Sequence, residues 1–88
     1  MTFRERYTHA QTWHDKAIVI ELYHLAMTHR NKGWTISKTA EYFQCSIGLV
    51  SENLKLAHAI HIQPSILNIP SRQEALRKLN GFNDSQKR

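Results

Sequence analysis

The fold is decided by the stretch Trp34-Thr-Ile-Ser-Lys-Thr-Ala-Glu-Tyr-Phe-Gln-Cys-Ser-Ile-Gly-Leu-Val-Ser-Glu-Asn-Leu-Lys-Leu-Ala57. Apolar residues recur at helical spacing on both sides of a short break, Gln44-Cys45-Ser46. Thr35 and Ser46 are residue types that favour the N-cap position, so the spacing predicts one helix over about 36–44 and another over about 47–61. Together they predict a helix-turn-helix over about 35–59.

A pair of helices joined by so short a turn needs a small residue where the helices approach and an apolar residue that locks them together. Ala40 is the small residue, and Val50 follows it ten residues later in the second helix. Phe43 and Leu54 are expected to complete this apolar wedge. The turn position Gln44, where glycine is common, must tolerate a positive φ or reshape the turn.

A longer helix is predicted before this stretch, from an N-cap at Thr12 to about residue 29. Its apolar residues form an unusually broad arc, which includes Ile18, Leu22 and Leu25. An arc of this width indicates cover from two sides, one by the domain itself and one by a second protomer, so a homodimer is expected.

The flanking segments complete an all-α fold class, a small helical domain of three to four helices with a central helix-turn-helix. Residues 1–11 are interpreted as a flexible basic arm, or as a short helix that orders on docking. Ser71 to Glu74 has the capping-box pattern, and a short helix from there should end at Asn80-Gly81. One domain over 12–82 and a frayed tail over 83–88 are therefore predicted.

The composition favours a polyanionic partner. The chain has 88 residues, and its 12 Lys and Arg against 7 Asp and Glu give a formal net charge of +5. A single cysteine, Cys45, suits a reducing cytoplasm. The apolar run at 17–20 is too short for a membrane span or a signal-peptide core, so no membrane partner is expected.

The same stretch resembles the helix-turn-helix of the ParB/KorB family. The shared features are a cap Thr, an Ala-Glu pair, a turn Ser, a Val and a Leu-Lys-Leu ending, found here as Thr35, Ala40-Glu41, Ser46, Val50 and Leu54-Lys55-Leu56. The resemblance implies double-stranded DNA as the partner, and a phage- or plasmid-type transcriptional regulator or a partition-related factor. It also implies a nucleoid-associated location in a bacterial or phage-infected host cell. The family's nucleotide-binding domain is absent, so nucleotide binding is not carried over.

The DNA-binding residues are expected on the outer face of the second motif helix and around the starts of both helices. They are Arg30, Lys32, Thr35, Ser37, Lys38, Ser46, Ile47, Gly48, Ser51, Glu52 and Lys55. The outer face of the second motif helix, which would contact the bases, has no Arg and no Gln. Because these are strong base-contacting residues, modest sequence specificity is expected. Arg4 and Arg6 are candidates for a minor groove, and Arg72, Arg77 and Lys78 for a further phosphate patch.

Other classes of function have weaker support. His58 and His61 have the spacing of two metal ligands on a helix, but no third ligand is evident, and neither a metal nor a cofactor is expected. No nucleophile with a base and no phosphate-binding glycine loop indicates an enzyme. The main alternative is a small protein–protein adaptor that docks on a protein partner through the neutral, partly apolar face with Ile47, Leu49 and Glu52. A fragment or accessory of a larger DNA-modifying system is a third interpretation.

Overall fold

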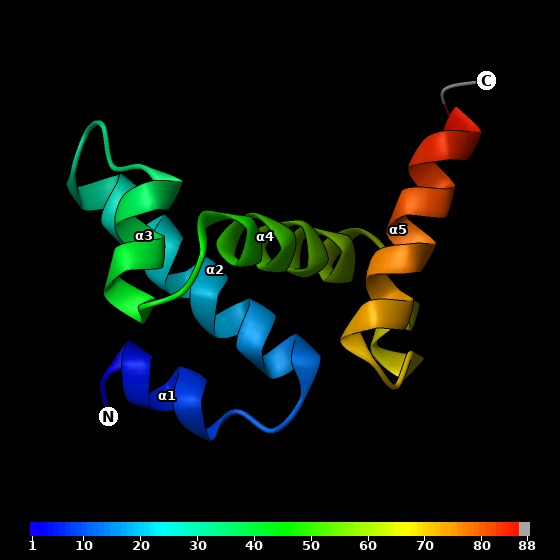
Figure 1. Cartoon of the computed structure of the whole chain (residues 1–88), viewed down its shortest axis with the longest axis horizontal. Helices are drawn as coiled ribbons and strands as arrows, with labels where there is room; N and C mark the ends of the chain where they lie inside the picture. Colours follow the sequence, from blue (N-terminus) through cyan, green and yellow to red (C-terminus); the bar gives the residue numbers. More distant parts are fainter. Residues whose placement is uncertain (87–88) are drawn as a thin grey trace.

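The computed structural model describes the backbone of residues 1–86 and the side chains of residues 1–79, and all of its regular structure is helical (Figure 1). The predicted all-α class is therefore confirmed. The elements are α1 (Phe3–His9), α2 (Trp13–Arg30), α3 (Ile36–Phe43), α4 (Ile47–Ile62), the short 3-10 helix η1 (Pro64–Asn68) and α5 (Arg72–Gln86).

The three predicted N-caps start their helices as expected. In each case the side-chain oxygen accepts a hydrogen bond from the amide three residues later, which satisfies one of the free amides of the first turn. The distances are 3.1 Å for Thr12, 3.3 Å for Thr35 and 3.0 Å for Ser46. The starts of α2, α3 and α4 were thus readable from single residues.

The amino-terminal segment is a helix, where a flexible arm or a helix ordering on docking was expected. Thr2 and Glu5 form a reciprocal capping box that starts α1, and the hydrogen bonds from Thr2 lower the pKa of Glu5. Phe3 and Tyr7 pack on the aromatic residues beneath. The capping-box pattern Thr-x-x-Glu at residues 2–5 was the sequence signal that predicts this helix.

The carboxyl-terminal helix continues past its predicted end. Ser71 accepts a hydrogen bond from the amide of Glu74 at 3.2 Å, as expected for a cap. The prediction that Asn80-Gly81 ends this helix is wrong, because α5 continues through both residues to Gln86. A single glycine costs a helix only about 1 kcal/mol, which is too little to end it without a further breaker. Residues 87–88 of the predicted frayed tail lie outside the described residues.

Helices α2 and α4 cross at the centre of the molecule and form most of its core (Figure 1). Toward α5 they enclose a first apolar cluster, which also contains Ile66 of η1 and Ala75 of α5. The α2 and α4 members of this cluster are Trp13, Ala17, Leu56, Ala57, Ala59 and Ile60. The indole Nε1 of Trp13 donates a hydrogen bond to the carbonyl oxygen of Ile69 at 2.8 Å, which ties η1 and the start of α5 to α2.

A second apolar cluster lies toward α1 and α3. It consists of Val19, Ile20, Tyr23, Ala40, Phe43 and Val50. The ring of Tyr23 stacks on that of Tyr42 at a centroid distance of 4.1 Å and meets Phe43 edge-on at 5.2 Å. Aromatic packing therefore holds α3 against α2, and Val50 of α4 is buried in the same cluster.

The broad apolar arc of α2 is covered on one side only. Ala17 and Ile20 are fully buried, whereas Leu22 and Leu25 on the other side remain 42% and 56% exposed. Within the described part of the chain, no helix has both the length and the apolar character needed to cross a membrane.

Candidate functional site

The connection between α3 and α4 is short and has a defined geometry. Gln44 adopts a left-handed conformation with φ 57° and ψ 47°. This conformation lets the amide of Cys45 donate to the carbonyl oxygen of Ala40 at 3.0 Å, so that the end of α3 is satisfied and the chain reverses at once. Of the two outcomes expected at Gln44, a positive φ or a reshaped turn, the structure has the positive φ.

Behind this turn the two helices are locked by small and apolar side chains. Ala40 is 3% exposed and Val50 is fully buried, as their ten-residue spacing predicted. Phe43 belongs to the same cluster, and Leu54 is half-buried beside it. Partial burial raises the pKa of the Cys45 thiol, which fits a packing residue in the turn.

A buried hydrogen-bond network joins α2 to α3. Thr39 is fully buried, and its hydroxyl oxygen accepts from the indole Nε1 of Trp34 at 2.9 Å and lies 2.7 Å from His24 Nδ1. The indole takes one lone pair of the Thr39 oxygen and leaves the hydroxyl proton free, so we assign that proton to His24 Nδ1, with the neutral ring protonated at Nε2. Burial lowers the pKa of His24, which favours the neutral ring. His24 is therefore part-buried and belongs to this network.

Another polar side chain, Asn53, occupies the inner face of α4. It is 2% exposed, and its amide nitrogen donates to the carbonyl oxygen of Leu49 at 2.9 Å. Its carbonyl oxygen is buried without a hydrogen-bond partner. The polar residue thus sits in the core, at a position where apolar residues are common.

The outer face of α4 carries the residues expected to read DNA bases. Ile47 is 55% exposed, and Gly48 and Lys55 are exposed as well, whereas Ser51 is half-buried. Gly48 stands in open space, since a Cβ atom added there would meet only the Ser46 hydroxyl oxygen, at 4.0 Å. The start of α4 therefore presents a smooth, weakly charged surface.

Glu52 on this face has a partner from another helix. The Arg72 guanidinium at the start of α5 forms an ion pair with the Glu52 carboxylate. Since the pair is partly exposed, it contributes little to stability, but it neutralises the carboxylate that would repel phosphate. It also occupies the Glu52 carboxylate, the group on this face that suits an amino group of cytosine, and it removes Arg72 from the expected phosphate patch.

The basic residues of the expected site follow the connection from α2 to α3. Arg30 ends α2, Lys32 lies in the loop, and Lys38 in the first turn of α3 has its ammonium group 5.5 Å from the centre of the Trp34 ring. All three are exposed, as are Thr35 and Ser37. The Thr35 hydroxyl is committed to the Lys38 amide, which leaves the first two amides of α3 free.

Arg4 and Arg6 differ in their surroundings from the expected minor-groove arm. Arg4 Nε donates to the carbonyl oxygen of Tyr42 at 3.0 Å, and its guanidinium lies over the Tyr42 ring. Arg6 lies over the ring of Phe3 at 5.4 Å. Arg4 thus fastens α1 to the end of α3.

The histidines considered as metal ligands are not brought together with further ligands. His61 Nε2 is 2.8 Å from a carboxylate oxygen of Glu21 on α2, whereas His58 is exposed. In the part of the chain that the structure describes, no three His, Cys, Asp or Glu side chains are placed to hold a metal ion.

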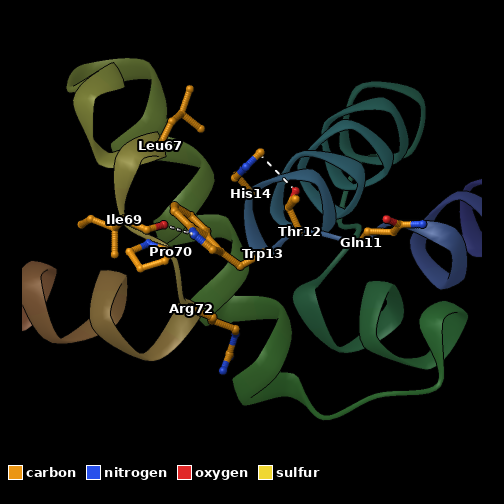
Figure 2. A pocket seen from close by; sticks show the side chains of 8 residues that line it. All are labelled: Gln11, Thr12, Trp13, His14, Leu67, Ile69, Pro70 and Arg72. Carbon is orange, nitrogen blue, oxygen red and sulfur yellow. Dashed lines mark hydrogen bonds between the residues drawn. The ribbon is translucent and has the colours of Figure 1, made fainter.

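A pocket of about 440 Å³ lies where the start of α2 meets the segment between η1 and α5 (Figure 2). Figure 2 shows the Trp13 indole directed to Ile69 and the His14 ring directed to Thr12. The lining residues are Gln11, Thr12, Trp13, His14, Leu67, Ile69, Pro70 and Arg72. Of the candidate DNA-contacting residues, Arg72 alone lines this pocket, and its guanidinium group also pairs with Glu52 on α4.

Comparison with protein-family models, with characterised proteins and with solved structures finds no match for this chain. The resemblance to the ParB/KorB motif therefore stays a prediction from residues 34–57 alone, and the function has to be argued from the site.

Proposed function

We propose that this protein binds duplex DNA, with α3 and α4 acting as a helix-turn-helix whose second helix enters the major groove. The observation that carries the proposal is the α3–α4 connection. A left-handed Gln44 and the Cys45-to-Ala40 hydrogen bond set the angle between the helices, while Gly48 and Lys55 remain exposed on the outside of α4. A groove-binding helix needs a rigid base and an uncovered outer face of this kind.

Phosphate contacts would come from the starts of the two helices. Since Thr35 and Ser46 each cap only one amide, the first two amides of α3 and α4 are free to donate to phosphate oxygens. Arg30, Lys32 and Lys38 add exposed positive charge next to the start of α3. The net charge of +5 supports the same partner.

Base contacts would be few. The Lys55 ammonium group can donate a hydrogen bond to guanine, and the Ser51 hydroxyl can bond to several bases. The Ile47 side chain can pack against a thymine methyl group. Glu52 is held by Arg72, so a contact with cytosine would first require that ion pair to open. We therefore propose a sequence-biased binder; a role as a phage- or plasmid-type regulator or partition-related factor rests on the motif resemblance.

The proposal is tested by fluorescence anisotropy with a labelled random duplex of about 30 base pairs, titrated at several salt concentrations. Three or four phosphate contacts predict a log–log slope of Kd against salt of about 3 in magnitude. Absence of binding at tens of micromolar protein in low salt would contradict the proposal.

Charge-matched variants locate the surface. Lys38→Ala and Lys55→Ala should each weaken binding by about three- to tenfold and reduce the salt slope by about one. Lys16→Ala removes the same charge from α2, where the ammonium group lies over the Tyr7 ring and outside the candidate DNA contacts, and serves as the control. Equal losses in all three variants would indicate attraction by net charge alone.

A second candidate function, docking on another protein, is favoured by one observation. Ile47 is 55% exposed at the start of α4, and the neighbouring Glu52 carboxylate is neutralised by Arg72. Protein docking predicts loss of the complex in Ile47→Asp with little dependence on salt. DNA binding predicts the opposite pattern: sensitivity to Lys38→Ala and a steep salt dependence.

A further inference from the structure

The outer face of α4 receives a guanidinium group from another helix. Glu52 lies four residues after Gly48 and three before Lys55, so these residues are neighbours on one side of α4. Arg72, at the start of α5, donates a hydrogen bond from Nη2 to the Glu52 carboxylate. Helix α4 has no arginine of its own, so α5 supplies the guanidinium at the border of this face.

The start of α5 is held in place by buried contacts. Ala75, one turn after Arg72, is fully buried in the first apolar cluster. The Trp13 indole donates to the carbonyl oxygen of Ile69, which fixes the segment just before α5. Figure 2 shows the end of the Arg72 side chain turned away from the Trp13 indole. The backbone that carries Arg72 is therefore fixed, while its guanidinium group is directed to α4.

The ion pair leaves hydrogen-bond donors of Arg72 unused. A guanidinium group has five N–H donors. Glu52 accepts from Nη2 through one carboxylate oxygen, and Nε is buried without a partner among the described residues. Because 32% of the Arg72 side chain is still accessible, its terminal nitrogens are the donors that a ligand can reach.

This arrangement suits the edge of a base better than a phosphate group. The Glu52 carboxylate offsets the charge of Arg72, so the pair adds little general attraction for DNA. The same carboxylate limits the directions in which the guanidinium can point, and a fixed planar donor fits two acceptors that lie side by side. Among the four bases, guanine alone presents two acceptors in the major groove, O6 and N7.

We propose that Arg72 is a specificity-determining residue that donates to O6 and N7 of a guanine in the major groove, and that Glu52 is the positioning residue that holds it. This inference rests on the proposed binding of DNA by α4, and it names a base that the site prefers. The ion pair stays closed during recognition, because Glu52 uses one N–H group and the guanine uses the remaining terminal ones.

Selection of binding sites from a duplex library with a random centre tests the proposal. The wild type should select at least one guanine position, and labelled duplexes that differ only at that base pair should differ in Kd by about tenfold. In Arg72→Ala this ratio should fall below about twofold, while binding to a random duplex weakens by less than about threefold. Lys38→Ala is the control, because loss of a phosphate contact should weaken both duplexes equally and leave the ratio unchanged.

The outcomes separate this inference from the proposed function. Binding to random duplexes without any guanine position that depends on Arg72 would overturn the inference and leave the proposed function standing. An equal loss for both duplexes in Arg72→Ala would also overturn it, since the ion pair would then act on stability alone. Absence of binding to any duplex would overturn both proposals.

The positioning role of Glu52 predicts two effects of opposite sign. Glu52→Ala removes a negative charge near the DNA and should strengthen binding to a random duplex by about two- to threefold. The same variant frees the guanidinium, so the preference for guanine should fall by about threefold or more. Glu52→Gln keeps an acceptor oxygen for Arg72 Nη2 and should retain more of this preference than Glu52→Ala.

A purely structural ion pair would not raise affinity and lower specificity together. An unchanged preference for guanine in Glu52→Ala would therefore overturn the positioning role. Far-UV circular dichroism checks that every variant keeps its helices, as expected for a partly exposed pair that contributes little to stability.

Discussion

The guanidinium of Arg4 caps the carboxyl-terminal turn of a helix that lies 38 residues further along the chain. Its Nε donates to the carbonyl oxygen of Tyr42 at 3.0 Å, and its central carbon lies 4.9 Å from the centre of the Tyr42 ring. A cation at this end of α3 satisfies a free carbonyl group and complements the helix dipole. The contact joins α1 to the helix that precedes the proposed groove-binding helix.

Arg4→Ala should lower the free energy of unfolding by about 1 kcal/mol, because it removes one hydrogen bond and one cation–π contact. Urea denaturation followed by circular dichroism measures the change. Arg6→Ala removes the same charge from the same helix but no hydrogen bond to α3. It should lower the free energy of unfolding by less than half as much as Arg4→Ala. Equal losses would show that Arg4 does not hold α3.

The buried hydroxyl of Thr39 should matter more than its methyl group. Thr39→Val keeps the shape but leaves the Trp34 indole without an acceptor and His24 Nδ1 without a donor, which should cost about 1–3 kcal/mol. Thr39→Ser keeps the hydroxyl and loses one methyl, at a cost of about 1 kcal/mol. Thermal unfolding compares the two variants, and a valine variant at least as stable as the serine variant would contradict the network.

The lowered pKa of His24 predicts a loss of stability in acid. In the unfolded chain the His24 ring takes up a proton near pH 6.5, whereas in the folded protein the ring stays neutral to a lower pH. The contribution of His24 is therefore fully present above pH 6.5 and is lost as the pH falls through its folded pKa.

Urea denaturation between pH 5 and 8 measures this dependence. His24→Asn, which does not titrate, should flatten the curve, whereas His58→Asn at an exposed position should leave it as steep as in the wild type. An NMR titration of the His24 ring with a midpoint above 6.5 would contradict the prediction.

Gln44→Gly should stabilise the protein by about 0.5–1 kcal/mol, because glycine adopts the left-handed conformation without a Cβ penalty. Gly33 offers the converse experiment, since its φ is +83° and a Cβ there would have no atom within 4 Å. Gly33→Ala should therefore cost about 1 kcal/mol through the backbone alone. Denaturation midpoints of the two variants should move in opposite directions. A shift in the same direction would contradict the left-handed conformation at Gln44 and Gly33.

Local signals made much of this fold predictable. Thr12, Thr35 and Ser46 set three helix starts, and the Ala40–Val50 pair set the contact between α3 and α4, because each depends on a few neighbouring residues. The ends of helices were less readable: the Asn80-Gly81 pair was expected to stop α5 and does not, since helix propensity is a weak force that other contacts override.

The contacts between distant segments were not predictable from the sequence. Nothing in the spacing of Glu52 and Arg72, twenty residues apart, indicates that they meet, because the approach of α5 to α4 depends on the path of the chain through η1. The same holds for His24 and Thr39. Trp34, which precedes α3, was the available hint of the Thr39 network, because the N–H group of a half-buried indole needs an acceptor.

The division of the core into two clusters has a consequence for local opening. Helices α2 and α4 contribute to both clusters, whereas η1 and α5 contribute only to the first and α1 and α3 only to the second. Separation of α5 would leave the second cluster closed, and separation of α1, which has no buried residue, would leave the first intact. In deuterated water the central amides of α2 and α4 should therefore exchange most slowly, through global unfolding alone, while those of α1 exchange first.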